Sequence, residues 1–423
     1  MKRLLVFLCV SALVFAVATP LLAGGIDNKH NFSAEYARTL NRNAATDSAD
    51  AVVYNPAGTV KMEDGLYVNL AGQYAFKDYS NTFNGTEYDS DEPDIVPSLF
   101  ALYRKDRWAG FAAFTIPAGG GSVDYEDGMA TTYRVAQGVI ATGAYAAGSI
   151  RDMGLEGEMY YYGITVGGAC ALNDWLSVSV GLRYVDANRE FEGFATMTPI
   201  APVPETLYVE YEETGHGWGG IFGMNISPTD ELNIGIRAET KTHLTLETDQ
   251  KRDDVETVLG GDLVPDNAKR NRDFPALFGF GVSYQLTSNL RTEANFTYYL
   301  ANDADWDDDP ITTGDETQKD DGFDIGIALE YAFTPKFKAS LGYMYTETEM
   351  DADDMLAAAP ELDAQSVAAG LAYEVMPGLH VNVGVIQTFY DEETTTPNAV
   401  FPTGIELEKE VTLVALGIQY KFW

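Results

Sequence analysis

The four histidines of the chain are the residues that hydrolytic chemistry would need first, and they are scattered along it. They are His30, His216, His243 and His380. Hydrolysis of a lipid or a peptide needs a nucleophile or a bound water beside a histidine that an acid orients. His380 with Asn382 is the only suggestive pair. The sequence therefore predicts that the protein is not an enzyme, and a lipid hydrolase is the least favoured alternative.

Cysteines and clustered acids are the next candidates, as metal ligands. Cys9 lies in the N-terminal leader, so Cys170 alone remains afterwards, and neither a disulfide nor a cysteine-based metal site is expected. Carboxylates crowd one stretch, at Asp303, Asp305, Asp307, Asp308 and Asp309. Asp308 stands where a calcium-binding EF-hand loop needs glycine, and no glutamate closes the loop. We expect a solvated acidic loop with no metal and no cofactor; diffuse divalent-cation binding is the alternative.

The charge balance limits the possible partners. The formal net charge is -37, from 64 acidic and 27 basic residues. A chain this acidic repels nucleic acid and anionic membrane surfaces, so no nucleic-acid partner is expected.

The N-terminus predicts a secretory signal peptide over residues 1–23. Lys2 and Arg3 precede an apolar stretch at residues 4–17, and small residues permit cleavage after residue 18 or residue 23. The mature chain is therefore expected to leave the cytoplasm.

The last fourteen residues alternate between two kinds of side chain. One face carries Thr412, Val414, Leu416, Ile418, Tyr420 and Phe422, and the other carries Leu413, Ala415, Gly417, Gln419 and Lys421. An apolar file that ends in aromatic residues, opposite a small and polar file, is typical of a strand with lipid on one side and a lumen on the other. The strand predicts an outer-membrane β-barrel, and its aromatic end predicts contact with the barrel-assembly machinery.

The same alternation recurs from Gly65 to the end and predicts a barrel domain over residues 65–423. The expected strands are residues 65–77, 97–103, 108–116, 159–171, 175–186, 207–227, 231–248, 274–286, 290–300, 322–333, 337–346, 363–375, 379–390 and 407–423. The connections between them alternate strictly between long and short, which predicts fourteen antiparallel strands with both ends of the domain on the short-turn, periplasmic side. After the leader no apolar run is long enough for a transmembrane helix.

Residues 24–64 lack the alternation and lie ahead of the first strand. Phe32, Tyr36 and Leu40 fall at helical spacing after Ser33. The segment is too short to be an independent domain. We therefore expect it to lie inside the lumen as a plug, or hatch, and a flexible periplasmic tail is the alternative.

The hatch segment ends in Asn55, Pro56, Ala57 and Gly58, directly before the first strand. With a plug of this length, fourteen strands and an aromatic C-terminus, the chain resembles the FadL-type family of outer-membrane transporters for long-chain fatty acids and other hydrophobic compounds. The resemblance implies a hydrophobic groove built by long outer loops, an inner pocket beside the hatch and a sideways opening near a kinked third strand.

The third expected strand runs into Pro117, Gly119, Gly120 and Gly121. Proline lacks the ladder donor and glycines lack side chains, so wall pairing is expected to weaken there. This is the candidate for a lateral gate. A flexible start to a long outer loop is the alternative.

The loop that follows is apolar between residues 131 and 150. Val135, Val139, Ile140 and Tyr145 are the expected lining of an outer landing groove for a hydrophobic ligand. Packing of this loop onto its neighbours is the alternative.

Asn55, Pro56, Ala57 and Gly58 are interpreted as an anchor of the hatch, because proline restricts the backbone around it and asparagine bonds nearby backbone. Cations of the lumen-facing files, Arg183 and Arg237 among them, are candidates to receive a carboxylate or to hold the plug by ion pairs. Arg38 and Arg42 of the hatch are expected to pair with acids of the wall.

The function that these features favour is uptake of long-chain fatty acid or another hydrophobic compound through a plugged barrel, with exit through the wall. Each methylene gains about 0.8 kcal/mol on leaving water, so an alkyl chain needs apolar sites and an exit into lipid. A general diffusion porin and an adhesin or structural barrel are the alternatives. Outer-membrane lipid and lipopolysaccharide are the expected surroundings.

Overall fold

The computed structural model describes residues 31–307, 320–348 and 350–423. The expected signal peptide, the first seven residues of the expected hatch, Asp308 and Asp309 lie outside the described residues.

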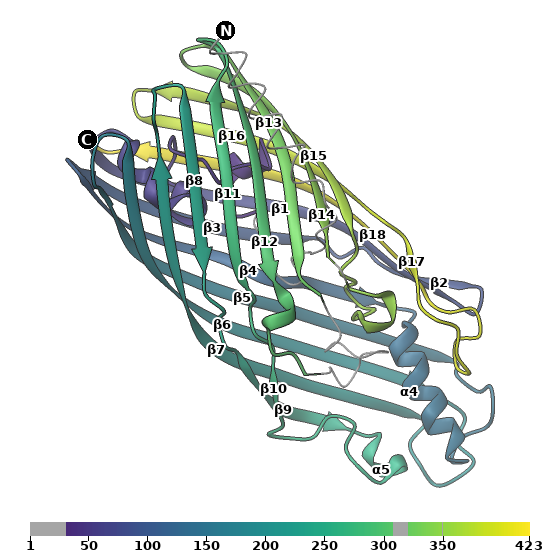
Figure 1. Ribbon diagram of the computed structural model, residues 1–423. Coiled ribbons are helices and arrows are strands. Elements are labelled where there is room, and N and C mark those ends of the chain that lie inside the picture. The colour runs from purple at the N-terminus through teal and green to yellow at the C-terminus, as the bar shows by residue number, and fades with distance from the viewer. Residues whose placement is uncertain (1–30, 308–319, 349) are drawn as a thin grey trace.

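The described strands form one closed antiparallel sheet (Figure 1). Their bounds are β1 (Gly65–Phe83), β2 (Thr86–Ser90), β3 (Asp94–Lys105), β4 (Trp108–Tyr125), β5 (Asp152–Ala171), β6 (Leu176–Thr196), β7 (Thr206–Ile226), β8 (Leu232–Glu239), β9 (Thr245–Asp253), β10 (Lys269–Asn271), β11 (Ala276–Gln285), β12 (Leu290–Leu300), β13 (Gly322–Thr334), β14 (Phe337–Glu347), β15 (Ala364–Met376), β16 (Leu379–Tyr390), β17 (Glu393–Thr394) and β18 (Glu406–Lys421).

Fourteen wall strands result among the described residues, because four pairs of labels each name one interrupted strand. These pairs are β2 with β3, β8 with β9, β10 with β11, and β16 with β17. The barrel closes where β1 pairs with β18, for example Leu70 with Ile418. The predicted fourteen-stranded barrel is confirmed.

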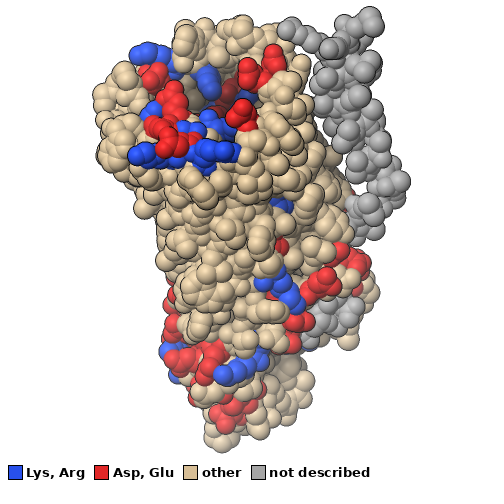
Figure 2. Space-filling view, turned by 60° about the vertical axis from the view of Figure 1, so that its left-hand side comes forward, with Lys and Arg blue, Asp and Glu red and all other residues tan. Residues whose placement is uncertain are grey.

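The outer surface follows the alternation of the sequence. On β18, Val414, Leu416 and Ile418 are exposed while Leu413 and Ala415 are buried. Figure 2 shows a largely uncharged belt between two charged ends, one of them hollowed. An apolar outer belt of this kind is the surface that a barrel presents to lipid. No helix among the described residues is long and apolar enough to cross a membrane.

The strands continue outward beyond the expected bounds, so several outer connections are shorter than expected. β1 runs on to Phe83 and turns at Asn84 and Gly85, both with positive φ, straight into β2. This two-residue hairpin replaces most of the expected long loop, because two residues with positive φ make the turn that matches strand twist. β4 likewise runs through the expected loop start to Tyr125.

The hatch lies inside the barrel, near the end that carries the C-terminus (purple in Figure 1). It holds α2 (Ala34–Ala37), α3 (Ala51–Tyr54) and the 3₁₀ helix η1 (Pro56–Lys61). Ser33 caps α2 by accepting a hydrogen bond from the Tyr36 amide at 3.0 Å. The side chains of all three helices except that of Lys61 are buried.

Seven inward-facing glycines let the hatch lie directly on the wall: a Cβ at four of them would meet hatch backbone, and at the other three hatch side chains. This glycine belt comprises Gly235, Gly281, Gly326, Gly342, Gly370, Gly384 and Gly417. A Cβ on Gly235 would lie 1.9 Å from the Asn43 carbonyl oxygen, and one on Gly342 would lie 2.0 Å from the Thr39 carbonyl oxygen. Residues 34–44 of the hatch therefore follow the wall from β18 round to β8 at a distance that no other side chain allows.

We predict that Gly342→Val displaces the hatch. The added side chain overlaps hatch backbone, and overpacking of this kind costs about 1–3 kcal/mol. Planar-bilayer recordings are expected to show a steady ion leak that the native protein lacks. Gly72→Val is the matched control, because a Cβ at Gly72 meets nothing within 4 Å. A leak of equal size in both variants would contradict the glycine-belt interpretation.

Candidate functional site: a lumen cavity beside a gap in the wall

Ion pairs tie the hatch to the wall and also brace it internally. Arg38 pairs with Glu330 of β13 at 2.9 Å, as expected. Arg42 pairs with Asp50 at 2.6 Å and Asp47 at 2.8 Å. The prediction that Arg42 pairs with a wall acid is therefore wrong: acids of its own segment lie closer, and they hold the two halves of the hatch together.

Arg183 and Arg237 converge on one wall acid, Glu239. The distances are 2.8 Å for Arg183 and 3.4 Å for Arg237. Arg237 also donates to the Val53 carbonyl oxygen of the hatch. Neither arginine lines the lumen cavity described below. The geometry favours their alternative role, which is to hold the plug.

The Asn55 to Gly58 element lies between the hatch and two strands. The Asn55 amide donates to the Ala45 carbonyl oxygen at 3.0 Å and to Asn225 of β7 at 2.7 Å. Ser177 of β6 donates to the Ala57 carbonyl oxygen at 2.6 Å. Pro56 begins η1. A Cβ on Gly58 would lie 2.4 Å from the Asn55 amide nitrogen, so glycine keeps this corner compact.

Glu35 of α2 joins the hatch to the strands near the place where β1 and β18 close the barrel. One oxygen accepts hydrogen bonds from Ser48 at 2.9 Å, Asn69 of β1 at 2.7 Å and Asn382 of β16 at 2.9 Å. Burial, and next the charge of Asp50, raise the pKa of Glu35 to about 7, against the opposing charges of Arg42 and Arg38.

Above the hatch lies the lumen cavity, a space of about 1410 Å³. Tyr36 and Leu40 of the hatch contribute to its lining, together with residues from β1, β3, β4, β5 and from the run of strands between β12 and β18. The lining is mostly aliphatic and aromatic, for example at Ile116, Met344 and Leu413. Lys77, Asp94, Asp324, Glu361 and Lys409 add charged groups to this lining. The cavity therefore combines apolar walls with polar groups that can orient a ligand.

The opposite side of the lumen is filled by the wall itself. Between β8 and β9 the chain folds inward over three glycines of β7: a Cβ on Gly217 would lie 2.2 Å from the His243 carbonyl oxygen. Phe274 stacks on Tyr161 with ring centroids 5.4 Å apart. The buried cluster here comprises Ala118, Tyr161, Val185, Ala187, Leu244, Leu246 and Phe274. The lumen cavity is therefore confined to one half of the barrel.

The hydrogen-bonded ladder of the wall is interrupted beside the lumen cavity, between β3 and β4. These strands pair only from Leu99 with Phe114 to Lys105 with Trp108. Farther out, β3 pairs only with β1, and β4 makes two register shifts against β5 between Thr115 and Gly121. The wall gap is the interruption between residues 95–98 of β3 and 115–121 of β4. Four extended residues span about 13 Å.

The glycine-rich segment predicted from the sequence lies on this gap. Pro117 packs against the position of Gly163, whose added Cβ would meet its ring at 3.0 Å. Gly119 and Gly121 have φ of +97° and +79° and line the lumen cavity. Gly120 lies between them in β4. The alternative, a flexible loop start, is wrong for this segment because β4 continues through it.

A second apolar space lies on the outer side under α4 (Ala130–Ala141). This outer groove measures about 560 Å³ and is lined by Val135, Val139, Phe191 and Val255, among others. Ile140 and Tyr145 are not in its lining. Tyr145 instead donates to the Pro204 carbonyl oxygen at 2.6 Å and tethers the loop. The hydroxyls of Thr131 and Thr132 are buried at the groove without a hydrogen-bond partner among the described atoms.

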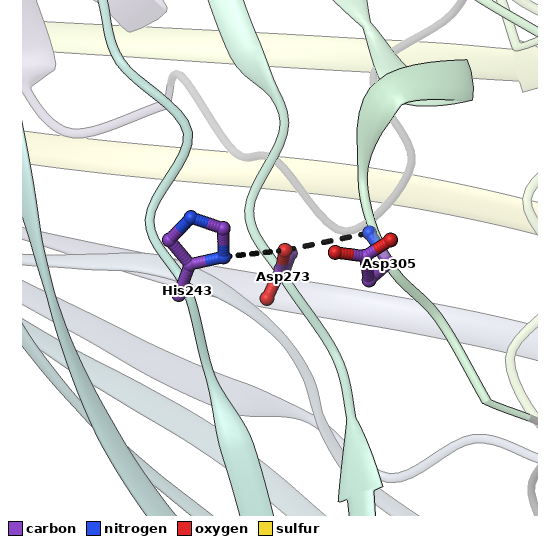
Figure 3. A group of neighbouring side chains, drawn as sticks. All are labelled: His243, Asp273 and Asp305. Carbon is purple, nitrogen blue, oxygen red and sulfur yellow. Dashed lines mark hydrogen bonds and ion pairs between the residues drawn. The ribbon is translucent and has the colours of Figure 1, made fainter.

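The described histidines do not assemble a hydrolytic site. His216 lies on β7, and His380 borders a polar pocket with Glu35 and Lys338. His243 contacts Asp273 at 3.0 Å, near Asp305 (Figure 3).

That His243 group resembles a set of metal ligands, but a cation is already present. The Lys241 ammonium lies 3.3 Å from Asp273 and 3.2 Å from Asp305. We interpret the group as a set of ion pairs and hydrogen bonds that holds the inward fold between β8 and β9 in place.

We predict a pH-dependent hatch that depends on Glu35. The folded pKa is about 7 and the ordinary value is 4.5. Since the folded state holds the proton more tightly, this contribution to stability is complete below about pH 4.5 and is lost as the pH rises through about 7. The leak in planar bilayers is expected to grow between pH 5 and pH 8, and Glu35→Gln is expected to remove that growth. An equal pH dependence in both proteins would assign the titration to another group.

Several solved structures share this architecture. A FadL homologue from Pseudomonas aeruginosa superposes with a TM-score of 0.68 at 15% identity, covering 95% of this chain and 100% of that one. The toluene transporter TodX of P. putida gives 0.68 at 13% identity, with 94% and 99% covered. The toluene transporter TbuX of Ralstonia pickettii gives 0.62 at 16% identity, with 89% and 94% covered. At these identities the likeness establishes the fold.

The curated proteins contain no match to the chain. The family model described as outer membrane protein transport protein (OMPP1/FadL/TodX) matches residues 14–422. With the barrel, its lipid-facing belt and the enclosed hatch, this match over nearly the whole chain places the protein in the OMPP1/FadL/TodX family of outer-membrane transport proteins.

Proposed function

We propose that the protein takes up hydrophobic small molecules, long-chain fatty acids or aromatic hydrocarbons among them, and releases them sideways through the wall gap into the membrane. In this proposal residues 1–23 are removed on export, residues 24–64 form the hatch and residues 65–423 form the barrel. The path begins in the outer groove, enters the lumen cavity and leaves between β3 and β4.

The observation that carries the proposal is the position of the lumen cavity. Tyr36 and Leu40 of the hatch line it, and Ile116, Gly119 and Gly121 of the wall gap line it too. The hatch rests on the glycine belt, so an axial route requires displacement of a segment that is packed against the wall over most of its length. A cargo that prefers apolar surroundings gains more by moving from the cavity into lipid than by entering water.

The outer groove supports a first capture step. It lies under α4, and Val135 and Val139 give it apolar walls. The unpartnered hydroxyls of Thr131 and Thr132 offer hydrogen bonds to a polar head, which suits an amphiphile as well as a hydrocarbon.

The alternatives have less support. A general diffusion porin needs an open lumen, whereas here the hatch and the cluster around Phe274 fill much of it. A lipid hydrolase needs a histidine with a nucleophile, and His380 faces a polar pocket beneath the hatch. We therefore propose a transporter without enzymatic activity.

The surroundings follow from the same surface. Outer-membrane lipid contacts the apolar belt, and lipopolysaccharide is the expected neighbour of the acidic outer ends. The C-terminal strand, with Phe422 and Trp423 exposed, is the proposed contact for the barrel-assembly machinery.

The lateral exit is tested by filling the gap from the β3 side. Ser98 is 2% exposed, and its hydroxyl has no hydrogen-bond partner among the described atoms. Ser98→Trp is expected to lower uptake of radiolabelled oleate or toluene at least tenfold. Leu99→Trp adds an indole on the lipid side of the same strand and is expected to leave uptake unchanged. Equal uptake by both variants, with both barrels folded, would contradict a lateral exit.

The capture step is tested on α4. Val139→Asp places a charge in the outer groove and is expected to weaken binding of a fluorescent fatty acid at least fivefold, because the carboxylate stays hydrated. Gln137→Asp, on the same helix outside the lining, is the control. If both variants bind like the native protein, the outer groove is not the landing site.

A further inference from the structure

The outer border of the wall gap is made by one carboxylate. Asp94, the first residue of β3, accepts hydrogen bonds from the Ser122 amide at 3.0 Å and the Ser122 hydroxyl at 3.1 Å, both on β4. It also accepts one from the Tyr160 hydroxyl of β5 at 2.5 Å. These bonds cross from β3 to the two strands on the far side of the gap, where no ladder bond joins β3 to β4.

The same carboxylate is held from the near side. The Lys77 ammonium of β1 pairs with Asp94 and also donates to the Ser122 carbonyl oxygen. Lys77 and Asp94 are 7% and 6% exposed. A buried ion pair that is this completely bonded fixes a geometry, because removal of either partner leaves the other charge unpaired away from water.

The glycine-rich segment has a second role at this border. A Cβ on Gly121 would lie 1.7 Å from a carboxylate oxygen of Asp94. Gly121 also has a φ of +79°, which glycine adopts without strain. The Asp94 carboxylate thus occupies the space that a side chain at Gly121 would fill. We call this space the seat of the carboxylate, and the inward bend of β4 at Gly121 provides it.

We propose that Asp94, seated on Gly121 and charge-paired with Lys77, sets the width of the wall gap and so the largest cross-section of cargo that leaves the barrel. The inner border is the backbone pairing of Leu99 with Phe114, whereas the outer border is held through side chains, so a side-chain substitution can alter the outer border. Besides the bonds of Asp94 and the Lys77 bond to Ser122, the Ser90 hydroxyl joins the border by accepting from the Asp124 amide at 2.8 Å. The inference rests on the proposed lateral exit and adds a specificity-determining residue to it.

The experiment compares a wide and a narrow hydrocarbon, pyrene and tetradecane, in cells that express the full-length protein. Gly121→Ala is expected to push the carboxylate from its seat while keeping both charges. Gly110→Ala on the same strand is the matched control, because a Cβ there meets nothing within 4 Å. The ratio of pyrene to tetradecane uptake is expected to rise at least threefold in Gly121→Ala and to stay at the native value in Gly110→Ala.

A second variant tests the proposal in case Gly121→Ala does not fold. The double variant Lys77→Met with Asp94→Leu removes the ion pair and the Asp94 hydrogen bonds without leaving an unpaired buried charge. Its folding is checked by the resistance of the barrel to SDS before boiling. A ratio that stays native or falls in the folded double variant overturns the assignment of Asp94. Failure of the proposed function is a different result: the native protein itself would then take up neither hydrocarbon faster than cells without it.

Discussion

The close approach of the hatch backbone to the wall is the constraint on which the rest of the structure depends. Residues 34–44 lie on the glycine belt at distances that exclude any Cβ, for instance at Gly235 and Gly342. Because the hatch is in contact with the wall, Arg38 reaches Glu330 and Glu35 reaches Asn69 and Asn382. The hatch thereby occupies the short-turn end of the lumen, and the lumen cavity lies on its other side.

Two inward bends of the wall divide the space that remains. The bend between β8 and β9 packs over glycines of β7, and its side chains fill the lumen around Phe274. The bend of β4 instead leaves residues 95–98 of β3 without a ladder partner on that side and borders the lumen cavity. Similar backbone bends thus have different results: one fills the lumen around Phe274, and the other interrupts the ladder between β3 and β4.

Much of the fold was predictable from the sequence, because alternation reports which face of each strand meets lipid. The final strand predicted the barrel, and the Pro117 to Gly121 stretch predicted where wall pairing weakens. The outer ends of the strands were less predictable. Beyond the membrane the strand residues, such as those of β2, are polar on both faces and show no apolar alternation.

The contacts of the hatch were not predictable, because they depend on which strand lies opposite which hatch residue. The glycines of the belt look like ordinary small residues of an inward file, and Arg42 gives no sign that Asp47 and Asp50 lie closer than the wall. Lys77 and Asp94 are 17 residues apart, and Asp94 falls in a stretch expected to be loop. Only the pairing of β1 with β3 brings them together.

The uneven filling of the lumen makes the barrel mechanically asymmetric. Along β5 to β11 the wall is braced from within by stacked rings and aliphatic side chains, as Tyr161 and Phe274 are stacked. Along β1, β3 and β4 it borders the lumen cavity, and we infer that this arc is the more compliant one. Lateral pressure from the bilayer therefore strains the arc that contains the interruption, so the thickness and tension of the surrounding membrane act on the protein mainly at that place.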